Sequence, residues 1–165
     1  MIFMNRRIIF LLAVFFACGL TAFSQSQDDN TPGQRLAFGV GPEMNMNSRE
    51  NFAFGGNFHL DFNIGSSCAA GLTVTVSHNF DDFTVIEPSA LFRWYFLGKN
   101  QTGLFVQADV GVYMFFDIEG LTPMFGGGLR GGLRIPLGDI FYIEPYGRIG
   151  YPFAFGVGAT AGLRL

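Results

Sequence analysis

Residues 52–64 read F-A-F-G-G-N-F-H-L-D-F-N-I and alternate between two kinds of side chain. Even-numbered positions carry phenylalanine, leucine or isoleucine, apart from Gly56, and odd-numbered positions carry small or polar residues such as His59 and Asp61. Successive side chains of a β-strand point to opposite faces, so this stretch predicts a strand with one apolar and one polar face. Its extended length of about 44 Å is long for a soluble strand and sufficient for a tilted transmembrane strand.

The same alternation recurs along the chain and predicts eight strands. Asp117–Pro123 is expected to be the longest loop, and Cys68 lies in an expected turn. Pro88 and Pro145 are expected at strand starts or bulges, because proline cannot donate to a strand ladder. An even number of strands places both termini of the barrel domain on one side of the membrane. The predicted strands span approximately residues 35–46, 52–64, 70–78, 83–96, 103–116, 124–135, 141–151 and 154–165.

The composition agrees with a membrane barrel formed by one domain. Of the 165 residues, 49% are hydrophobic and only 14% are charged, and 23 are glycine. After residue 24 there is no continuous apolar run of membrane-spanning length, so transmembrane helices are excluded there. We therefore predict an all-β fold, an eight-stranded antiparallel up-and-down transmembrane β-barrel.

The first 24 residues have the pattern of a cleaved signal peptide. Arg6 and Arg7 precede the apolar run 8–20, and Ala22-Phe23-Ser24 provides small residues at a cleavage site. Lipoprotein processing at Cys18 is the alternative. Residues 25–34 form a polar lead-in, and residues 35–165 form the barrel domain. The predicted location is the bacterial outer membrane.

Charge and cysteine content exclude several classes of function. Without Arg6 and Arg7, the chain has 10 − 2 = 8 basic and 13 acidic residues, a net charge of −5, which argues against a nucleic-acid partner. Cys68 is then the single cysteine, so neither an internal disulfide nor a cysteine zinc cluster is expected. No phosphate-binding loop, metal cluster or cofactor motif is present in the sequence.

The C-terminal stretch from Phe141 to Leu165 reads F-Y-I-E-P-Y-G-R-I-G-Y-P-F-A-F-G-V-G-A-T-A-G-L-R-L. Its final alternating strand resembles the assembly signal of outer-membrane barrels, although Leu165 stands where that family usually has an aromatic residue. From about residue 35 to 165 the layout is similar to the small eight-stranded barrels of the OmpA/OmpX-like group. This resemblance implies insertion by the barrel assembly machinery, with Leu163 and Leu165 in the assembly signal, and periplasmic termini.

Ten charged residues occupy predicted inward positions, five of each sign. Burial of an unpaired charge is very costly, so the balance predicts a paired network that fills the lumen. Pairing of the fifth and sixth strands would bring Asp109 near Arg130, and Glu144 would lie diagonal to Arg130 and Arg134. A charged pore lining is the alternative. The predicted network comprises Glu43, Asp61, Glu87, Arg93, Asp109, Arg130, Arg134, Glu144, Arg148 and Arg164.

Both histidines are candidates for a catalytic group of residues. Hairpin pairing would place Thr75 opposite His59, with Asp61 and Ser77 nearby, so a Ser-His-Asp set is conceivable. A polar network in a barrel interior explains the same residues without catalysis. His78 and Ser77 are adjacent and face opposite ways, unlike the His and Ser of outer-membrane lipid A deacylases, which lie two apart on the lipid face. No catalytic residue is therefore predicted.

The leading hypothesis is a non-enzymatic outer-membrane protein with a structural or interaction role. Its expected partners are outer-membrane lipids and the assembly machinery, and a monomer is expected. The alternatives are a porin-like small-solute pore, an outer-membrane lipid-modifying enzyme and a lipocalin-like binder of an apolar ligand. The lipocalin-like alternative requires the phenylalanines to face inward.

Overall fold

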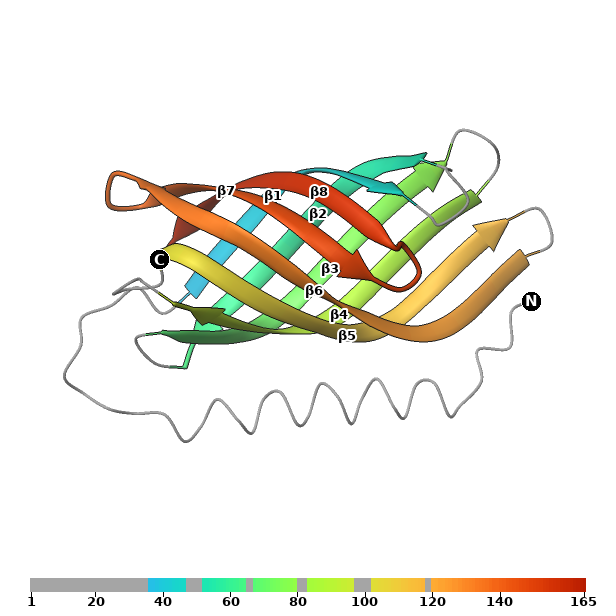
Figure 1. Ribbon diagram of the computed structural model, residues 1–165, viewed down its shortest axis with the longest axis horizontal. Coiled ribbons are helices and arrows are strands. Elements are labelled where there is room, and N and C mark those ends of the chain that lie inside the picture. The colour runs from blue at the N-terminus through green and yellow to red at the C-terminus, as the bar shows by residue number, and fades with distance from the viewer. Residues whose placement is uncertain (1–35, 47–51, 65–66, 80–82, 97–101, 118–119) are drawn as a thin grey trace. The chain divides into compact units, whose positions relative to one another are not determined.

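A computed structural model shows a closed antiparallel β-barrel (Figure 1). It describes residues 36–46, 52–64, 67–79, 83–96, 102–117 and 120–165, so the predicted signal peptide and lead-in lie outside the described residues. Consecutive strands pair throughout, and the last strand closes onto the first. The strands are β1 (Leu36–Met46), β2 (Phe52–Asn63), β3 (Cys68–Asn79), β4 (Phe83–Tyr95), β5 (Gly103–Asp117), β6 (Gly120–Leu137), β7 (Phe141–Gly150) and β8 (Phe155–Arg164).

The predicted fold class is confirmed, because all eight strands form one barrel in sequence order. Within the described ranges, no helix has the length and apolarity needed to cross a membrane. One end of the barrel, here called the loop end, holds the strand ends at Met46 and Phe52, Asn79 and Phe83, Asp117 and Gly120, and Gly150 and Phe155. The opposite end, called the turn end, holds the strand ends at Asn63 and Cys68, Tyr95 and Gly103, and Leu137 and Phe141, and there β1 begins and β8 finishes.

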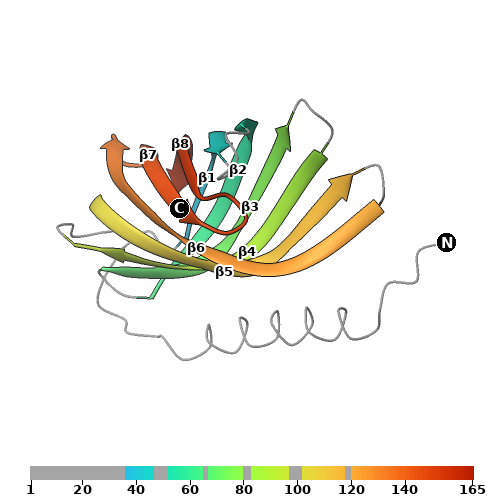
Figure 2. The ribbon, with the colours of Figure 1, turned by 45° about the vertical axis from the view of Figure 1, so that its right-hand side comes forward.

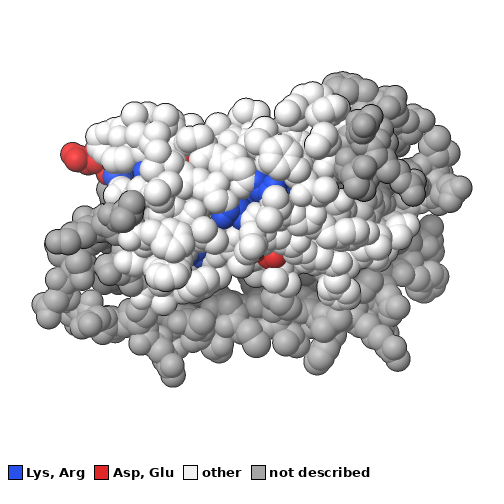
Figure 3. Space-filling view, in the orientation of Figure 1, with Lys and Arg blue, Asp and Glu red and all other residues white. Residues whose placement is uncertain are grey.

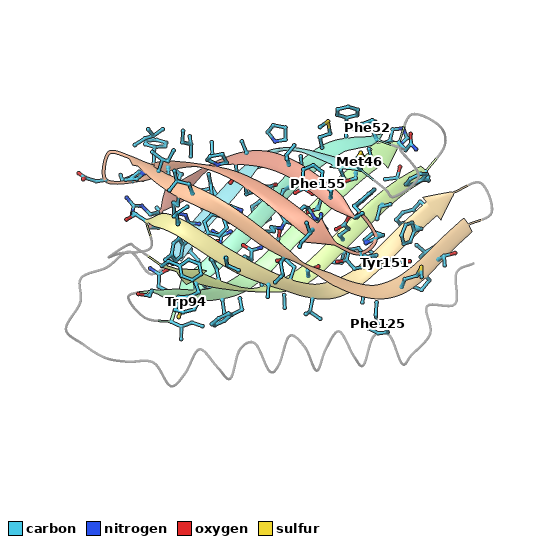
Figure 4. The ribbon with its side chains drawn as sticks, in the orientation of Figure 1. Met46, Phe52, Trp94, Phe125, Tyr151 and Phe155 are labelled. Carbon is cyan, nitrogen blue, oxygen red and sulfur yellow. The ribbon has the colours of Figure 1, made fainter. Side chains whose placement is uncertain are left out.

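The alternation of residues 52–64 separates the two faces of β2. Phe58 is 45% exposed on the outer wall, whereas its neighbour His59 is 1% exposed inside the barrel. The other strands follow the same rule, and the side chains that stand outward are mostly apolar (Figure 4). Phe52, Phe125 and Phe155 lie toward the loop end, and Trp94 lies toward the turn end.

Two predicted connections were wrong. The expected loop Asp117–Pro123 is instead mostly strand, because β5 continues to Asp117, which pairs with Gly120 at the start of β6. Only residues 118–119 separate these two strands. Cys68, expected in a turn, is the first residue of β3 and pairs with Trp94.

The prediction for Pro88 and Pro145 was also wrong, since both lie inside strands without a bulge. On each side of Pro88 the register between β4 and β5 is the same, from Ile86–Met114 to Ser89–Gly111. Pro88 remains paired with Val74 of β3, and Pro145 remains paired with β8. Each proline therefore interrupts the hydrogen-bonded ladder to one neighbouring strand and leaves the ladder to the other strand intact.

The wall of the barrel has unequal height around the loop end. The pairing of β6 with β7 begins only at Gly128, and the Gly127 carbonyl accepts from the Tyr151 amide just beyond β7, so residues 120–126 of β6 are paired with β5 alone. Figure 2 shows the β5–β6 hairpin extending past the connection between β7 and β8. Pro123 lies in this part of β6, which explains why a proline is compatible with the strand.

Inward glycines make room for aromatic rings from the adjacent strands. A Cβ atom at Gly132 would lie 2.6 Å from the Phe105 ring and 2.6 Å from the Pro145 carbonyl oxygen. Such cross-strand packing of a ring against a glycine stabilises a weak strand position. The directly opposed pairs are Phe105–Gly132, Tyr146–Gly158 and Tyr142–Gly162.

Candidate functional site

The candidate site is the barrel interior, where strands on opposite walls project charged side chains toward one another (Figure 4). Nine of the ten predicted network residues are at most 5% exposed. They form two ion-paired layers. The Asp61 layer comprises Asp61, Arg93, Arg134 and Glu144, and the Glu43 layer comprises Glu43, Glu87, Asp109, Arg130 and Arg148.

The Asp61 layer joins four strands nearer the turn end. Arg134 of β6 donates from Nη2 to Asp61 Oδ2 at 2.8 Å and from Nε to Glu144 Oε2 at 2.7 Å. Arg93 of β4 contacts the same two carboxylates, at 3.3 Å from Asp61 and 3.0 Å from Glu144. Two guanidiniums thus balance two carboxylates. Since β2 and β6 lie on opposite sides of the closed barrel, the Arg134–Asp61 pair crosses the lumen, whereas Arg134 and Glu144 belong to the adjacent strands β6 and β7.

Aromatic rings pack against the arginines of the Asp61 layer. The Arg93 guanidinium lies 4.3 Å from the centre of the Phe105 ring, and that of Arg134 lies 4.2 Å from the centre of Tyr142. A desolvated guanidinium above an aromatic face gains cation–π attraction in addition to its ion pairs. The layer is therefore held by planar stacking as well as by charge.

The Glu43 layer lies nearer the loop end and is built around one carboxylate. Glu43 Oε2 accepts from Arg130 Nη1 at 3.0 Å and from the Tyr146 hydroxyl at 2.6 Å. Glu43 Oε1 accepts from Arg148 Nη1 at 2.8 Å and from Asn45 Nδ2 at 2.8 Å. These four donors come from β1, β6 and β7, so Glu43 joins distant parts of the wall.

Charge is not balanced in the Glu43 layer, which has three carboxylates and two guanidiniums. Arg148 is shared, because its Nη2 donates to Glu87 Oε2 at 2.8 Å while its Nη1 is bound to Glu43. Asp109 accepts from Arg130 Nε at 2.8 Å. Glu87 Oε1 has no hydrogen-bond partner among the described residues. Glu87 is thus held less firmly than Glu43.

Gln107 connects the two layers. Its amide oxygen accepts from Arg93 Nε at 2.8 Å, and its Nε2 donates to Asp109 at 2.6 Å. Asn57 completes the Glu43 layer when its amide oxygen faces Arg130, because a guanidinium can only donate. The buried polar groups of both layers thereby form one connected network.

An apolar cluster lies in the interior near the loop end. Phe153, supplied by the connection between β7 and β8, is 2% exposed and packs with Tyr113, Val85 and Ala53. Phe83 and Phe115 pack against this cluster. A second cluster of Tyr95, Phe105, Tyr146 and Ala69 lies among the charged side chains. The interior therefore has aromatic as well as ionic packing.

One predicted neighbour and one predicted network residue were wrong. Asp109 does lie beside Arg130, but Glu144 contacts Arg134 and Arg93 and not Arg130. Arg164 lies outside both layers, near the end of β8, with Nη2 3.5 Å from the Asp139 carbonyl oxygen.

The conceivable Ser-His-Asp set is not assembled. His59 is paired with Thr73, whereas Thr75 is opposite Asn57. His59 Nε2 lies 2.9 Å from the Tyr142 hydroxyl and 3.6 Å from Asp61, while the Ser77 hydroxyl accepts from Asn45. In the described ranges, no group of three or more His, Cys, Asp or Glu side chains is arranged to hold a metal ion.

The two residues of the expected assembly signal lie where β8 pairs with β1 and closes the barrel. Leu163 is paired with Phe38 of β1 and with Phe141 of β7. The Leu165 amide donates to the Leu36 carbonyl at 2.8 Å, and the Leu36 amide donates back at 3.1 Å. The chain therefore pairs with β1 up to its last residue.

Sequence reasoning did not include several residues of the interior. Gln107, Phe105 and Phe153 are not among the ten residues predicted to fill the lumen, although all three are buried there. Phe105 has the same parity as Gln107 and Asp109, so the alternation of β5 could have placed it. Phe153 belongs to a connection, where no alternation applies.

These observations define the class: an eight-stranded antiparallel barrel with an apolar outer wall and a charged interior has the fold of the small outer-membrane-type β-barrels. No known family profile matches the sequence, and no curated protein sequence matches it.

Solved structures show the same fold. The N-terminal β-barrel domain of Pseudomonas aeruginosa OprF is similar with a TM-score of 0.59 and 14% identity, over 81% of this chain and 99% of that one. Neisserial surface protein A (NspA) is similar with a TM-score of 0.59 and 13% identity, over 79% of this chain and 94% of that one. The predicted resemblance to small outer-membrane-type barrels is thus confirmed at the level of fold.

Proposed function

We propose that this protein is an outer-membrane β-barrel with a plugged lumen and a structural or interaction role without catalysis. The outer wall supports the membrane location, because large apolar side chains such as Phe58, Phe92 and Val110 are 45%, 51% and 59% exposed on it. Such a surface is stable in hydrocarbon and prone to aggregation in water. The shared fold of two outer-membrane barrels agrees with this location.

The single observation that carries the plugged lumen is the pair of ion-paired layers that cross it. Eight strands enclose an interior that side chains just fill. Ion movement through this interior would require separating buried pairs that span it at 2.8 Å, such as Arg134–Asp61 and Arg148–Glu87. Breaking one buried pair costs about 3–5 kcal/mol.

The burial and the hydrogen-bond partners of His59 and Ser77 support a role without catalysis. His59 and Ser77 are at most 1% exposed, and each is engaged with a neighbour that is not a reacting group. A lipocalin-like function is disfavoured because Phe52, Phe54 and Phe58 face outward. The proposal includes export through a cleaved signal peptide, insertion by the assembly machinery, and a monomeric barrel in contact with outer-membrane lipids.

The test combines location and conductance. The protein is expressed with its own N-terminus, the outer-membrane fraction is isolated, and gel mobility is compared with and without heating. A heat-modifiable band in that fraction is expected. Purified protein is then placed in planar bilayers, where no steady channel openings are expected. Steady openings would overturn the plugged lumen in favour of a small-solute pore, and a soluble periplasmic protein would overturn the location.

A further inference from the structure

The outer wall is hollowed over β5–β8. A groove of roughly 740 Å³ is lined there by apolar side chains and glycines, and no charged residue lines it. This volume is within the range of small-molecule sites. Its sides include Leu104 and Val106 of β5, Leu133 of β6 and Val157 of β8.

Two opposed glycines form the floor of the groove. Gly131 of β6 is paired directly with Gly147 of β7 and with Val106 of β5. A Cβ atom at Gly131 would meet nothing within 4 Å, and one at Gly147 would meet only the Gly156 carbonyl oxygen at 3.8 Å. The hollow therefore exists because two outward positions lack the side chains that neighbouring positions carry.

Interior side chains come close to the outer surface at the groove. Basic residues are visible in the middle of the face in Figure 3, although the arginines of both layers are at most 5% exposed. The rings of Phe105 and Tyr146, which belong to the interior, also reach the groove lining. An apolar occupant would bring hydrocarbon directly against this backbone and exclude water from the adjacent ion pairs.

We infer that this groove holds an acyl chain of a phospholipid as a specific, retained ligand. The inference rests on the proposed membrane location, because the groove opens on the wall that would face hydrocarbon. An acyl chain is apolar, narrow and flexible, which suits a lining without charged side chains. A headgroup would find no charged partner among the twelve lining residues.

A second copy of the protein fits the groove less well. Stable protein interfaces contain about 20–30 residues per side, and the groove has twelve lining residues. The wall of a barrel is convex, so only a single projecting side chain of another copy could enter the hollow. A flexible chain fills it without that constraint.

The test is native mass spectrometry of protein refolded in vesicles of dioleoylphosphatidylcholine and extracted in a mild detergent. The wild-type barrel is expected to retain one phospholipid. The double variant Gly131→Leu with Gly147→Leu fills the floor of the groove and is expected to retain no phospholipid. The matched control Ala108→Leu adds the same side chain at an outward position of β5 outside the groove, and is expected to retain the lipid.

Three results would overturn the inference: no retained lipid in the wild type, equal retention in the filled variant, or a wild-type dimer that the filled variant abolishes. If the double variant does not fold, Gly131→Leu alone is measured, and unchanged retention again overturns the inference. Heat-modifiable mobility of every variant is recorded separately, so loss of the folded barrel is distinguished from loss of the lipid site. The outer-membrane fractionation described above tests the membrane location independently.

Discussion

Adjacent glycines in β6 provide a sensitive test of the inward and outward faces. Gly131 faces the outer wall, and Gly132 faces the interior opposite Phe105. Neither has a left-handed backbone, so an alanine is compatible with the strand at both positions. The substitutions Gly131→Ala and Gly132→Ala add the same methyl group one residue apart and differ only in what that methyl meets.

The expected magnitudes follow from the space at each position. At Gly131 the methyl enters open space, and the loss of glycine freedom in the unfolded chain stabilises the barrel by about 0.4–1 kcal/mol. At Gly132 it would lie 2.6 Å from the Phe105 ring and from the Pro145 carbonyl oxygen, well inside ordinary contacts of about 3.5–4.0 Å. Phe105 cannot easily retreat because it packs against Arg93 and Tyr95. Overpacking of this kind costs about 1–3 kcal/mol.

The assay is urea unfolding of the barrel in vesicles, followed by the fluorescence of the protein's single tryptophan, Trp94. Gly132→Ala should unfold at lower urea than the wild type, and Gly131→Ala at equal or higher urea, with similar slopes. Addition of Phe105→Leu to Gly132→Ala should recover part of the loss by removing the ring. Equal effects of the two alanines, or the reverse order, would refute the assignment of the faces and of the ring packing.

The alternation of side chains was enough to predict the strands and their faces. A one-residue shift of a strand would move every side chain to the other face, so a pattern such as Phe58-His59-Leu60 specifies its orientation strongly. A hairpin register also follows from the residues near its connection, which explains why Asp109 could be placed close to Arg130. The pairing is offset by two residues, since Asp109 is directly opposite Gly128.

Local patterns could not predict the interruptions of the ladder. A strand inside a barrel has two neighbours, and a proline such as Pro145 loses its hydrogen bond to one of them only. Pro123 loses no hydrogen bond toward β7, because that part of β6 is not paired with β7. Residues typical of turns were therefore compatible with long strands, and the predicted loop was too long.

The partners within the charged layers also depend on information that no short stretch contains. Arg134 reaches Asp61 because barrel closure brings β6 opposite β2, and this relation depends on the tilt of all eight strands. The alternation of inward and outward positions along each strand correctly placed both residues inside the barrel. The unequal charges of the two layers, by contrast, become apparent only when the side chains are assigned to depths along the axis.

The remaining predictions concern lipid contact, the charged layers and closure of the barrel. Leu60→Arg, on the outer wall of β2, should destabilise the barrel by about 2–4 kcal/mol in vesicles, measured by urea titration; a neutral effect would place Leu60 away from hydrocarbon. Glu144→Gln should cost about 3–5 kcal/mol, because Asp61 alone would then face two buried guanidiniums. Glu87→Gln should cost less in the same titration, since it removes the unbalanced carboxylate of its layer, and the opposite order would contradict the two-layer assignment. Deletion of residues 159–165 should abolish the folded barrel entirely, because it exposes the β1 edge paired with these residues, and each unpaired backbone group in hydrocarbon costs several kcal/mol. Leu165→Phe, which keeps an apolar side chain and the backbone bonds to β1, should assemble at least as well as the wild type, whereas Leu165→Asp should assemble less well. The amount of heat-modifiable barrel in the outer-membrane fraction measures all three, and a wild-type amount from the truncated chain would show that β8 is not needed to close the barrel.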